Sequence, residues 1–148
     1  MFNLFKNNKE DQESGYQSYS KIAALLIHAA KIDGSYTKDE EEIIKKTLVE
    51  LGAKVSNIDL IITNALNFEE NSNQILDFTK EIKKAAEPDK IKIIESLWKI
   101  IYSNNIGDMY ETNLMRRLAG LLYIDAKIMG DIKKKIKKEL KNDIPSKR

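Results

Sequence analysis

The sequence predicts an all-α protein, a single compact bundle of about seven helices with an internally duplicated helical hairpin. Apolar residues recur at spacings of three and four along most of the chain, which is typical of amphipathic helices. No segment alternates apolar and polar residues over a useful length, so strands are not expected. The 148 residues, 42% of them hydrophobic, suffice for one domain of ordinary size with one core.

The chain divides into three predicted ranges. Residues 1–18 are polar and charged, and we expect a mobile N-terminal tail because they cannot bury enough apolar surface to become ordered. Residues 19–142 are predicted to form the helical domain. Residues 143–148 are predicted to be a C-terminal tail.

The first helical hairpin is predicted at residues 19–52. Its first helix is expected to close at Gly34, because glycine readily adopts the left-handed conformation that ends helices. Its second helix begins at Thr37, and Glu40 completes a capping box in which each side chain bonds the other residue's backbone amide. Gly52 ends this helix. The two apolar stripes are Ile22, Leu25, Leu26, Ala29 and Ile32, and then Ile43, Ile44, Leu48 and Leu51.

Five further helices are predicted after this hairpin. Ser56 is expected to cap the third, and a polar run separates the third from a fourth that carries Phe78. The fifth, over residues 88–103, is apolar around most of its circumference and is therefore expected at the centre of the fold. Amphipathic helices over residues 108–122 and 126–141 follow.

When the sequence is aligned with itself at the offset that matches Thr37 to Asp108, the first hairpin aligns with a later one. We refer to this offset as the shift. The same shift places Glu40 on Glu111, so both second helices open with a cap residue and a glutamate three positions on. We expect two similar hairpins that pack together and cover each other's apolar faces. The other matched pairs are Leu26 with Leu97, Asp33 with Asn104, Gly34 with Asn105, Ile43 with Leu114 and Ile44 with Met115.

Composition excludes several classes of site and partner. The chain has no cysteine, which excludes disulfides, thiolate zinc sites, iron–sulfur clusters and cysteine nucleophiles. Its 25 basic and 23 acidic residues balance to a net charge of +2, which implies no obligatory polyanion partner. The glycine motifs of nucleotide-binding loops are absent, so no nucleotide is expected. Arginines are few and no aromatic residue interrupts the lysine-rich end, so no nucleic acid is expected.

A cytoplasmic location is predicted from the apolar runs. A membrane-spanning helix needs about 20 apolar residues, and the longest run here is much shorter. The opening residues have no basic leader followed by an apolar stretch, so no secretory signal is expected.

The acidic turn between the first two helices is the main candidate for a site. Asp33 follows a helix C-terminus, whose partial negative charge disfavours a carboxylate there. The free amides at Thr37 could offset this charge, and so could a bound cation. An all-oxygen metal site suited to Ca²⁺, Mg²⁺ or Mn²⁺ would consist of Asp33, Glu40, Asn104 and Glu111.

The simpler alternative is that these residues only cap helices. The pair Thr37 and Glu40 needs only local geometry, whereas a metal site needs several distant side chains to converge. Residue chemistry alone therefore favours capping. An EF-hand is disfavoured, because the turn lacks the alternating acidic ligands and the glutamate at the twelfth loop position.

Three segments carry a resemblance to a known family. They read LLIHAAKIDG at residues 25–34, WKIIYSNN at 98–105 and YETNLMRRLAGLL at 110–122. In this order, with Glu40 after the first, they resemble the tellurite-resistance TerB-like family over about residues 22–124.

The resemblance implies an all-helical bacterial protein with a duplicated hairpin, found beside tellurite-resistance and other stress-response proteins. A related domain occurs in membrane-anchored co-chaperones. The family's acidic residues have been taken as a metal-binding site, which adds weight to a cation at Asp33, Glu40 and Glu111. The family usually repeats its Asp-Gly pair in the second half, whereas this chain has Asn104 and Asn105, so a site here would be weaker, lopsided or confined to the first hairpin.

Three functions remain open at this point. The first is a non-enzymatic protein that binds a divalent cation, a basic protein partner or both in an acidic groove between the two hairpins. The second is a membrane-surface or protein-interaction adaptor that uses the lysine-rich final helix. A solvated helix face is the simpler interpretation of these lysines. The third, a metal-assisted hydrolase, would need a general acid and a pocket that the sequence does not supply, so no enzyme is expected. The lysines of the final helix are Lys133, Lys134, Lys135, Lys137, Lys138 and Lys141.

Two conspicuous side chains are expected to be structural. His28 lies near the buried face of its helix and is predicted to be hydrogen-bonded and partly buried rather than a ligand or proton carrier. Trp98 is predicted to be part of the core, since it lies in the most apolar helix.

Overall fold

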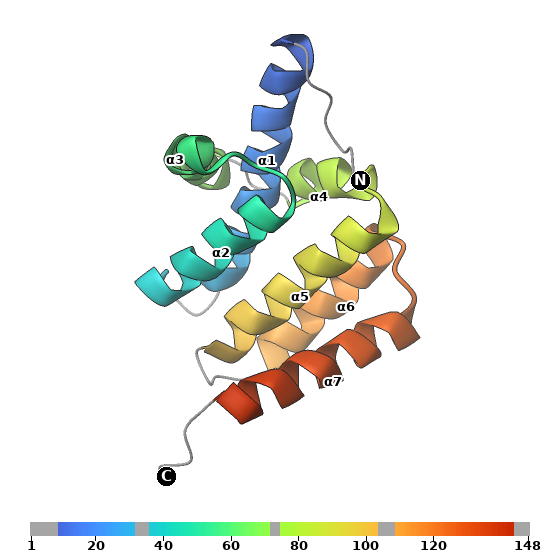
Figure 1. Cartoon of the computed structure of the whole chain (residues 1–148). Helices are drawn as coiled ribbons and strands as arrows, with labels where there is room; N and C mark the ends of the chain where they lie inside the picture. The colour runs from blue at the N-terminus through green and yellow to red at the C-terminus, as the bar shows by residue number, and fades with distance from the viewer. Residues whose placement is uncertain (1–8, 32–35, 72–74, 104–108, 144–148) are drawn as a thin grey trace.

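The computed structural model describes residues 9–31, 36–71, 75–103 and 109–143. Side chains are described for residues 17–31, 36–71, 75–102 and 113–139. The described residues form seven α-helices, one 3₁₀-helix and no strand, which confirms the all-α class (Figure 1). The elements are α1 (Lys9–Lys31), α2 (Lys38–Glu50), η1 (Val55–Asn57), α3 (Ile58–Asn71), α4 (Leu76–Lys83), α5 (Glu87–Ser103), α6 (Met109–Leu121) and α7 (Ala126–Asp143).

Two predicted helix starts differ from the structure. Helix α1 begins at Lys9, within the range predicted as a tail. Its side chains are described from residue 17, and Ser18 is the first of these that is buried. The mobility of residues 1–18 stays a prediction. Ser56 does not cap α3, because it lies inside η1, where the Asn57 amide donates to the Lys54 carbonyl at 2.9 Å. This tight turn leads the chain directly into α3.

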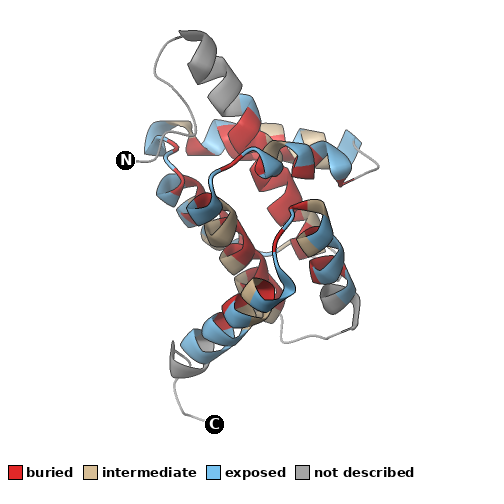
Figure 2. Ribbon diagram, turned by 90° about the vertical axis from the view of Figure 1, so that its right-hand side faces the viewer, coloured by how far each residue is buried: buried red, intermediate tan, exposed pale blue. Residues whose placement is uncertain are grey.

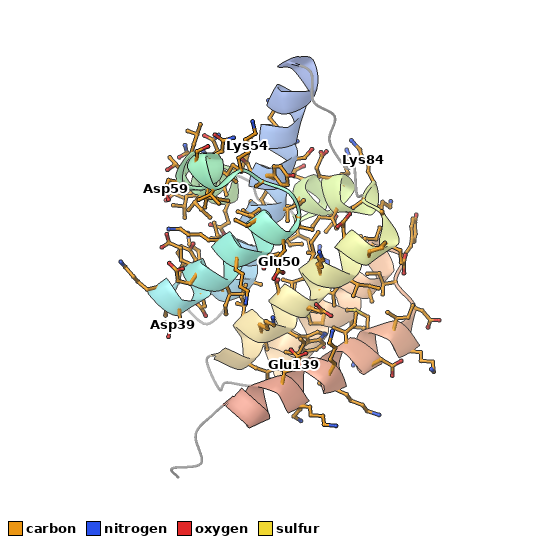
Figure 3. The ribbon with its side chains drawn as sticks, in the orientation of Figure 1. Asp39, Glu50, Lys54, Asp59, Lys84 and Glu139 are labelled. Atoms are coloured by element: carbon orange, nitrogen blue, oxygen red, sulfur yellow. The ribbon has the colours of Figure 1, made fainter. Side chains whose placement is uncertain are left out.

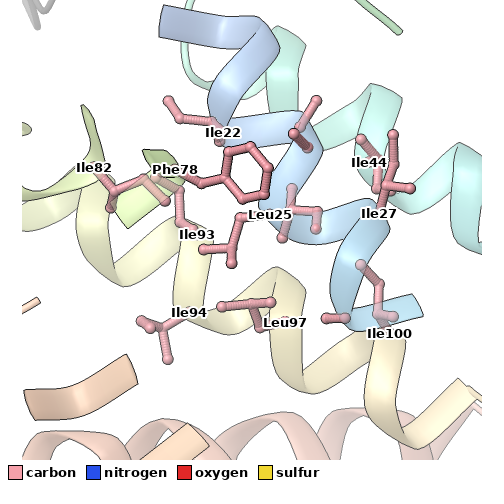
Figure 4. Close-up of a cluster of buried hydrophobic side chains, with 14 of the residues drawn as sticks. Ile22, Leu25, Ile27, Ile44, Phe78, Ile82, Ile93, Ile94, Leu97 and Ile100 are labelled. Carbon is pink, nitrogen blue, oxygen red and sulfur yellow. The ribbon is translucent and has the colours of Figure 1, made fainter. Parts of the chain in front are cut away.

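Helices α1 and α5 share the centre of the fold. Helix α1 packs against α2, α3, α4 and α5, and α5 packs against α1, α2 and α7. The prediction gave the centre to α5 alone, but α1 buries every side chain from Ile22 to Ile27. Figure 4 shows side chains of both helices meeting those of α2 and α4, and Figure 2 shows the buried faces turned inward. The meeting residues include Ile22, Leu25, Ile27, Ile44, Phe78, Ile82, Ile93, Ile94, Leu97 and Ile100.

The shift that places Thr37 on Asp108 also relates the ends of α2 and α6. The Ala53 amide donates to the Leu48 carbonyl at 2.9 Å, and the Ile124 amide donates to the Ala119 carbonyl at the same distance. Between these bonds lie the two described residues with positive φ, Gly52 at 115° and Tyr123 at 58°. Each helix therefore ends in a Schellman closure at the same position of the two halves. These paired residues are Leu48 with Ala119, Gly52 with Tyr123 and Ala53 with Ile124.

The correspondence continues into the neighbouring helices. The Tyr19 hydroxyl of α1 donates to the Leu51 carbonyl at 3.2 Å, and the Lys90 ammonium of α5 donates to the Leu122 carbonyl at 3.3 Å. The same shift pairs buried residues of α3 and α7, namely Ile58 with Met129, Ile61 with Ile132 and Ala65 with Ile136. The duplicated hairpin stays a prediction at its two turns, because residues 32–35 and 104–108 lie outside the described residues.

The two positive-φ positions should respond differently to substitution. We expect Gly52→Ala to destabilise the protein by about 2 kcal/mol, because φ is unfavourable for alanine and its Cβ would lie 2.8 Å from the Tyr19 hydroxyl. Tyr123→Gly should stay within about 1 kcal/mol of wild type. Glycine relieves the backbone there but removes the ring that lies 4.5 Å from the Lys83 ammonium. Urea unfolding measures the stability of both variants. Equal losses of unfolding free energy in the two variants would contradict the different roles given to the two positions.

Candidate functional site

Glu40 is the one predicted ligand whose side chain belongs to the described residues. It is the third residue of α2, and its side chain is completely buried, with 0% exposed. The Thr37 amide donates to Glu40 Oε1 at 2.8 Å, and the Glu40 amide donates to Thr37 Oγ1 at 3.1 Å. The predicted capping box is therefore confirmed.

The burial of Glu40 goes beyond what capping requires. Glutamate is almost never fully buried unless it is paired, because an ionised carboxylate loses its hydration when it leaves water. The Thr37 amide and the positive end of the α2 dipole both compensate the charge. Glu40 takes part in a further interaction as well. The start of α2 is thus an environment that concentrates positive potential on one buried carboxylate.

Tyr36 adds a hydroxyl to this environment, and the sequence analysis missed it. Its side chain is partly buried, and its hydroxyl oxygen is buried without a hydrogen-bond partner among the described residues. Burial, and then the charges of Glu41 and Glu40, raise its pKa well above the usual range. The hydroxyl therefore stays protonated and lies within the field of these carboxylates. The only sequence signal was its position just before the cap residue Thr37.

The other acids at the start of α2 have different surroundings. Glu41 pairs with Lys45 at 3.1 Å, and Lys45 also lies 3.5 Å from Asp59 of α3. The hydrogen bond that Lys45 donates to Glu41 raises the pKa of Lys45, and the Lys45–Asp59 pair of this surface cluster links α2 to α3. Asp39 is exposed to solvent, and Figure 3 labels it at the start of α2. Of the acids in the first turn of α2, Glu40 is the one that points into the protein.

The remaining predicted ligands lie partly or wholly outside the described residues. Asp33 and Asn104 belong to the two turns that are not described. Glu111 is the third residue of α6, the position that Glu40 holds in α2, but its side chain is not described. Among the side chains that the structure describes, no three histidine, aspartate or glutamate residues form a group that could hold a metal. The convergence of all four ligands stays a prediction.

A partly buried ion pair holds the end of α1 that leads into the acidic turn. Glu69 of α3 accepts from the Lys31 ammonium at 2.9 Å and lies 3.3 Å from His28 Nδ1. The side chain of Glu69 is only 12% exposed and that of His28 is 38% exposed. His28 is thus hydrogen-bonded and partly buried, as predicted. The local pattern of α1 contained no signal for its partner on α3.

Trp98 and the lysines of α7 lie as the sequence predicted. Trp98 is buried in the core and stacks on Tyr102 at a centroid distance of 5.7 Å. Lys133 lies 5.3 Å from the Trp98 ring centre, and Lys135 pairs with Glu95 at 2.7 Å. Lys134, Lys137 and Lys138 are exposed. None of the described helices is long and apolar enough to cross a membrane.

The ion pair on Glu69 should make stability depend on pH in acid. Burial alone would raise the pKa of Glu69, but hydrogen bonds and charges from Lys31 and His28 outweigh it and lower the pKa below 4.5. The stabilisation is therefore present above about pH 4.5 and is lost as the pH falls through the folded-state pKa. In urea unfolding, wild type should have a higher free energy of unfolding than Glu69→Gln at neutral pH, and this difference should disappear in acid. The exposed neighbour variant Glu70→Gln should follow wild type, and a pH-independent gap between wild type and Glu69→Gln would contradict the ion pair.

Comparison with known proteins identifies the family. A family model described as tellurite resistance protein TerB matches residues 20–134, from the buried part of α1 into α7. No curated protein and no solved structure matches the chain significantly. Because the family model covers most of the chain, including parts of all seven described helices, this chain belongs to the TerB family of tellurite resistance proteins.

Proposed function

We propose that this TerB-family chain is a non-enzymatic, cytoplasmic bacterial protein that binds a divalent cation, a basic protein partner or both at an acidic groove between its two hairpins. The family supports a role in the response to tellurite or another stress. The observation that carries the proposal is the complete burial of the Glu40 carboxylate at the start of α2. A buried carboxylate gains most from a positive charge brought to it.

The donor atoms fit a hard divalent cation. The proposed ligands are Asp33 and Glu40 from the first hairpin, with Asn104 and Glu111 from the second. All four offer oxygen, which Ca²⁺, Mg²⁺ and Mn²⁺ prefer. The buried hydroxyl of Tyr36, which lacks a hydrogen-bond partner among the described residues, is a further oxygen in the same turn. The cation would supply charge neutralisation and would join the two halves of the fold.

Equivalent positions of Glu40 and Glu111 support a shared site. Both are third residues of helices that end in the same closure, and one shift along the chain relates the two helices from start to end. The two halves contribute unequally, because Asn104 stands where Asp33 stands in the first half and carries no charge. Most of the binding free energy is therefore assigned to Asp33 and Glu40.

Glu40→Gln separates a ligand from a cap. Glutamine keeps the shape and can still accept the Thr37 amide, so capping alone predicts little change in stability. A metal ligand would instead lose its charge. Titration calorimetry with Ca²⁺, Mg²⁺ and Mn²⁺ should show affinity at least about tenfold weaker in Glu40→Gln and Asp33→Asn.

Glu42→Gln is the matched control, since Glu42 is an exposed glutamate of the same helix. It should bind metal like wild type. Wild-type protein that gives no heat beyond dilution at millimolar metal would end the cation proposal. Equal metal affinity of wild type and Glu40→Gln would show that the role of Glu40 is purely structural.

The second candidate, an adaptor that uses α7, is supported by exposed lysines. Lys134, Lys137 and Lys138 are exposed and take part in none of the ion pairs of the described residues. The apolar side of α7 is already used, because Ile132 and Ile136 are buried in the core. Contact with an anionic membrane would therefore be electrostatic and sensitive to salt.

Charge removal tests the adaptor without unfolding the protein. Lys134→Gln, Lys137→Gln and Lys138→Gln together should weaken co-sedimentation with phosphatidylserine vesicles about tenfold or more at low salt, because they remove three exposed lysine charges outside the described ion pairs but no core residue. Truncation before α7 would remove core residues such as Ile136 and would not be informative. Vesicle binding that is unchanged in the triple variant would eliminate α7 as the contact.

A further inference from the structure

We propose that a groove between α1, α3 and α4 binds a short acidic peptide segment of a partner protein. The groove has a volume of about 870 Å³ and is open to solvent. Pockets of about 300–1,000 Å³ typically hold drug-sized ligands, so the groove can take a few residues of a peptide. The described residues that line it belong to α1, α3 and α4 or, like Lys84, directly follow α4, and none of them belongs to the start of α2, where the cation site is proposed.

Two lysines on different helices supply the charge that an acidic ligand needs. Lys21 extends from α1 and Lys80 from α4, and neither belongs to an ion pair within the described part of the chain. Lys21 lies 6.0 Å from the Phe68 ring centre, at the outer limit of a cation–π contact. Both ammonium groups are therefore available to carboxylates on a ligand.

The acids of the groove are already engaged. Glu81 accepts a hydrogen bond from the Ser18 hydroxyl at 2.7 Å and lies 3.7 Å from the Lys84 ammonium. Asp77 takes part in an interaction of its own. Lys84, which directly follows α4 and is labelled in Figure 3, is paired with Glu81. The described lining holds three lysines, Lys21, Lys80 and Lys84, against the two carboxylates of Asp77 and Glu81, so it is net positive, and Lys21 and Lys80 are its lysines outside the ion pairs of the described residues.

The remaining lining distinguishes a peptide from a simple anion. Phe68 supplies partly exposed apolar surface, whereas Phe78 is buried beneath the groove, and Figure 4 shows it between α4 and α1. Asn67 and Asn71 lie four residues apart on α3, hence on one face, and their amides both donate and accept. Paired amides suit a peptide backbone, and the ring of Phe68 suits an apolar side chain between acidic ones.

Fluorescence anisotropy tests the proposal on the full-length protein. The probe is a fluorescein-labelled octapeptide of alternating glutamate and leucine, with glutamate–glycine and lysine–leucine octapeptides as comparisons. We expect saturable binding of the first peptide only, weakened by added salt. The double variant Lys21→Gln/Lys80→Gln should weaken it about tenfold or more. The matched control Lys46→Gln/Lys54→Gln removes two exposed lysines that do not line the groove and should bind like wild type.

Amide chemical shifts locate the site independently of affinity. Peptide binding should shift resonances of Lys21, Asn67 and Lys80 and leave those of α7 unchanged. Equal binding of the lysine–leucine peptide, equal weakening in the Lys46→Gln/Lys54→Gln control, or no saturable binding would overturn the proposal. Decanoate that binds at Lys21 and Lys80 where no peptide does would also overturn it and assign the groove to a small amphipathic acid.

Discussion

The burial of α1 is the constraint on which the rest of the structure depends. Its side chains from Ile22 to Ile27 are all buried, so every neighbouring helix must cover part of its surface. Helices α2, α3, α4 and α5 do so, which leaves no free side on this stretch. A helix that is apolar all round can exist in water only in such a position. The candidate cation site is proposed where the covering helix α2 begins, and the groove lies where α3 and α4 meet α1.

The candidate cation site depends on the way α1 is held. The pair of Lys31 and His28 with Glu69 attaches the last turn of α1 to α3, just before the turn that contains Asp33. On the other side of that turn, the capping box fixes the start of α2 and directs Glu40 inward. The turn is thus bounded by two rigid ends. Such preorganisation lowers the cost of gathering ligands around an ion.

The groove between α1, α3 and α4 arises from a different feature, the helix that has no counterpart in the other half. The shift that superimposes the two helix closures relates α1, α2 and α3 to α5, α6 and α7, and α4 lies between the two sets. Lys21 and Lys80 face the groove from the first set and from this inserted helix. The two proposed sites therefore have opposite charge and separate structural origins.

Local sequence patterns predicted the helices but not the contacts between distant ones. Thr37 and Glu40 lie three residues apart, so their capping box could be read directly from the chain. The 3₁₀ turn around Ser56 depends on how the chain passes from α2 to α3, which propensity does not encode. The link between His28 and Glu69 joins residues 41 positions apart, and the apolar spacing of α1 carries no information about it. The groove likewise depends on three helices meeting.

The most direct test of the central claim is paramagnetic broadening of amide resonances by Mn²⁺. A cation shared between the two hairpins predicts selective broadening at Thr37 and Glu40 and at Glu111, at Mn²⁺ concentrations well below those of the protein. Resonances of Lys80 in the groove should stay sharp. Broadening confined to the surface acids Glu41 and Asp59, or spread evenly over the protein, would contradict a site built from both halves of the fold.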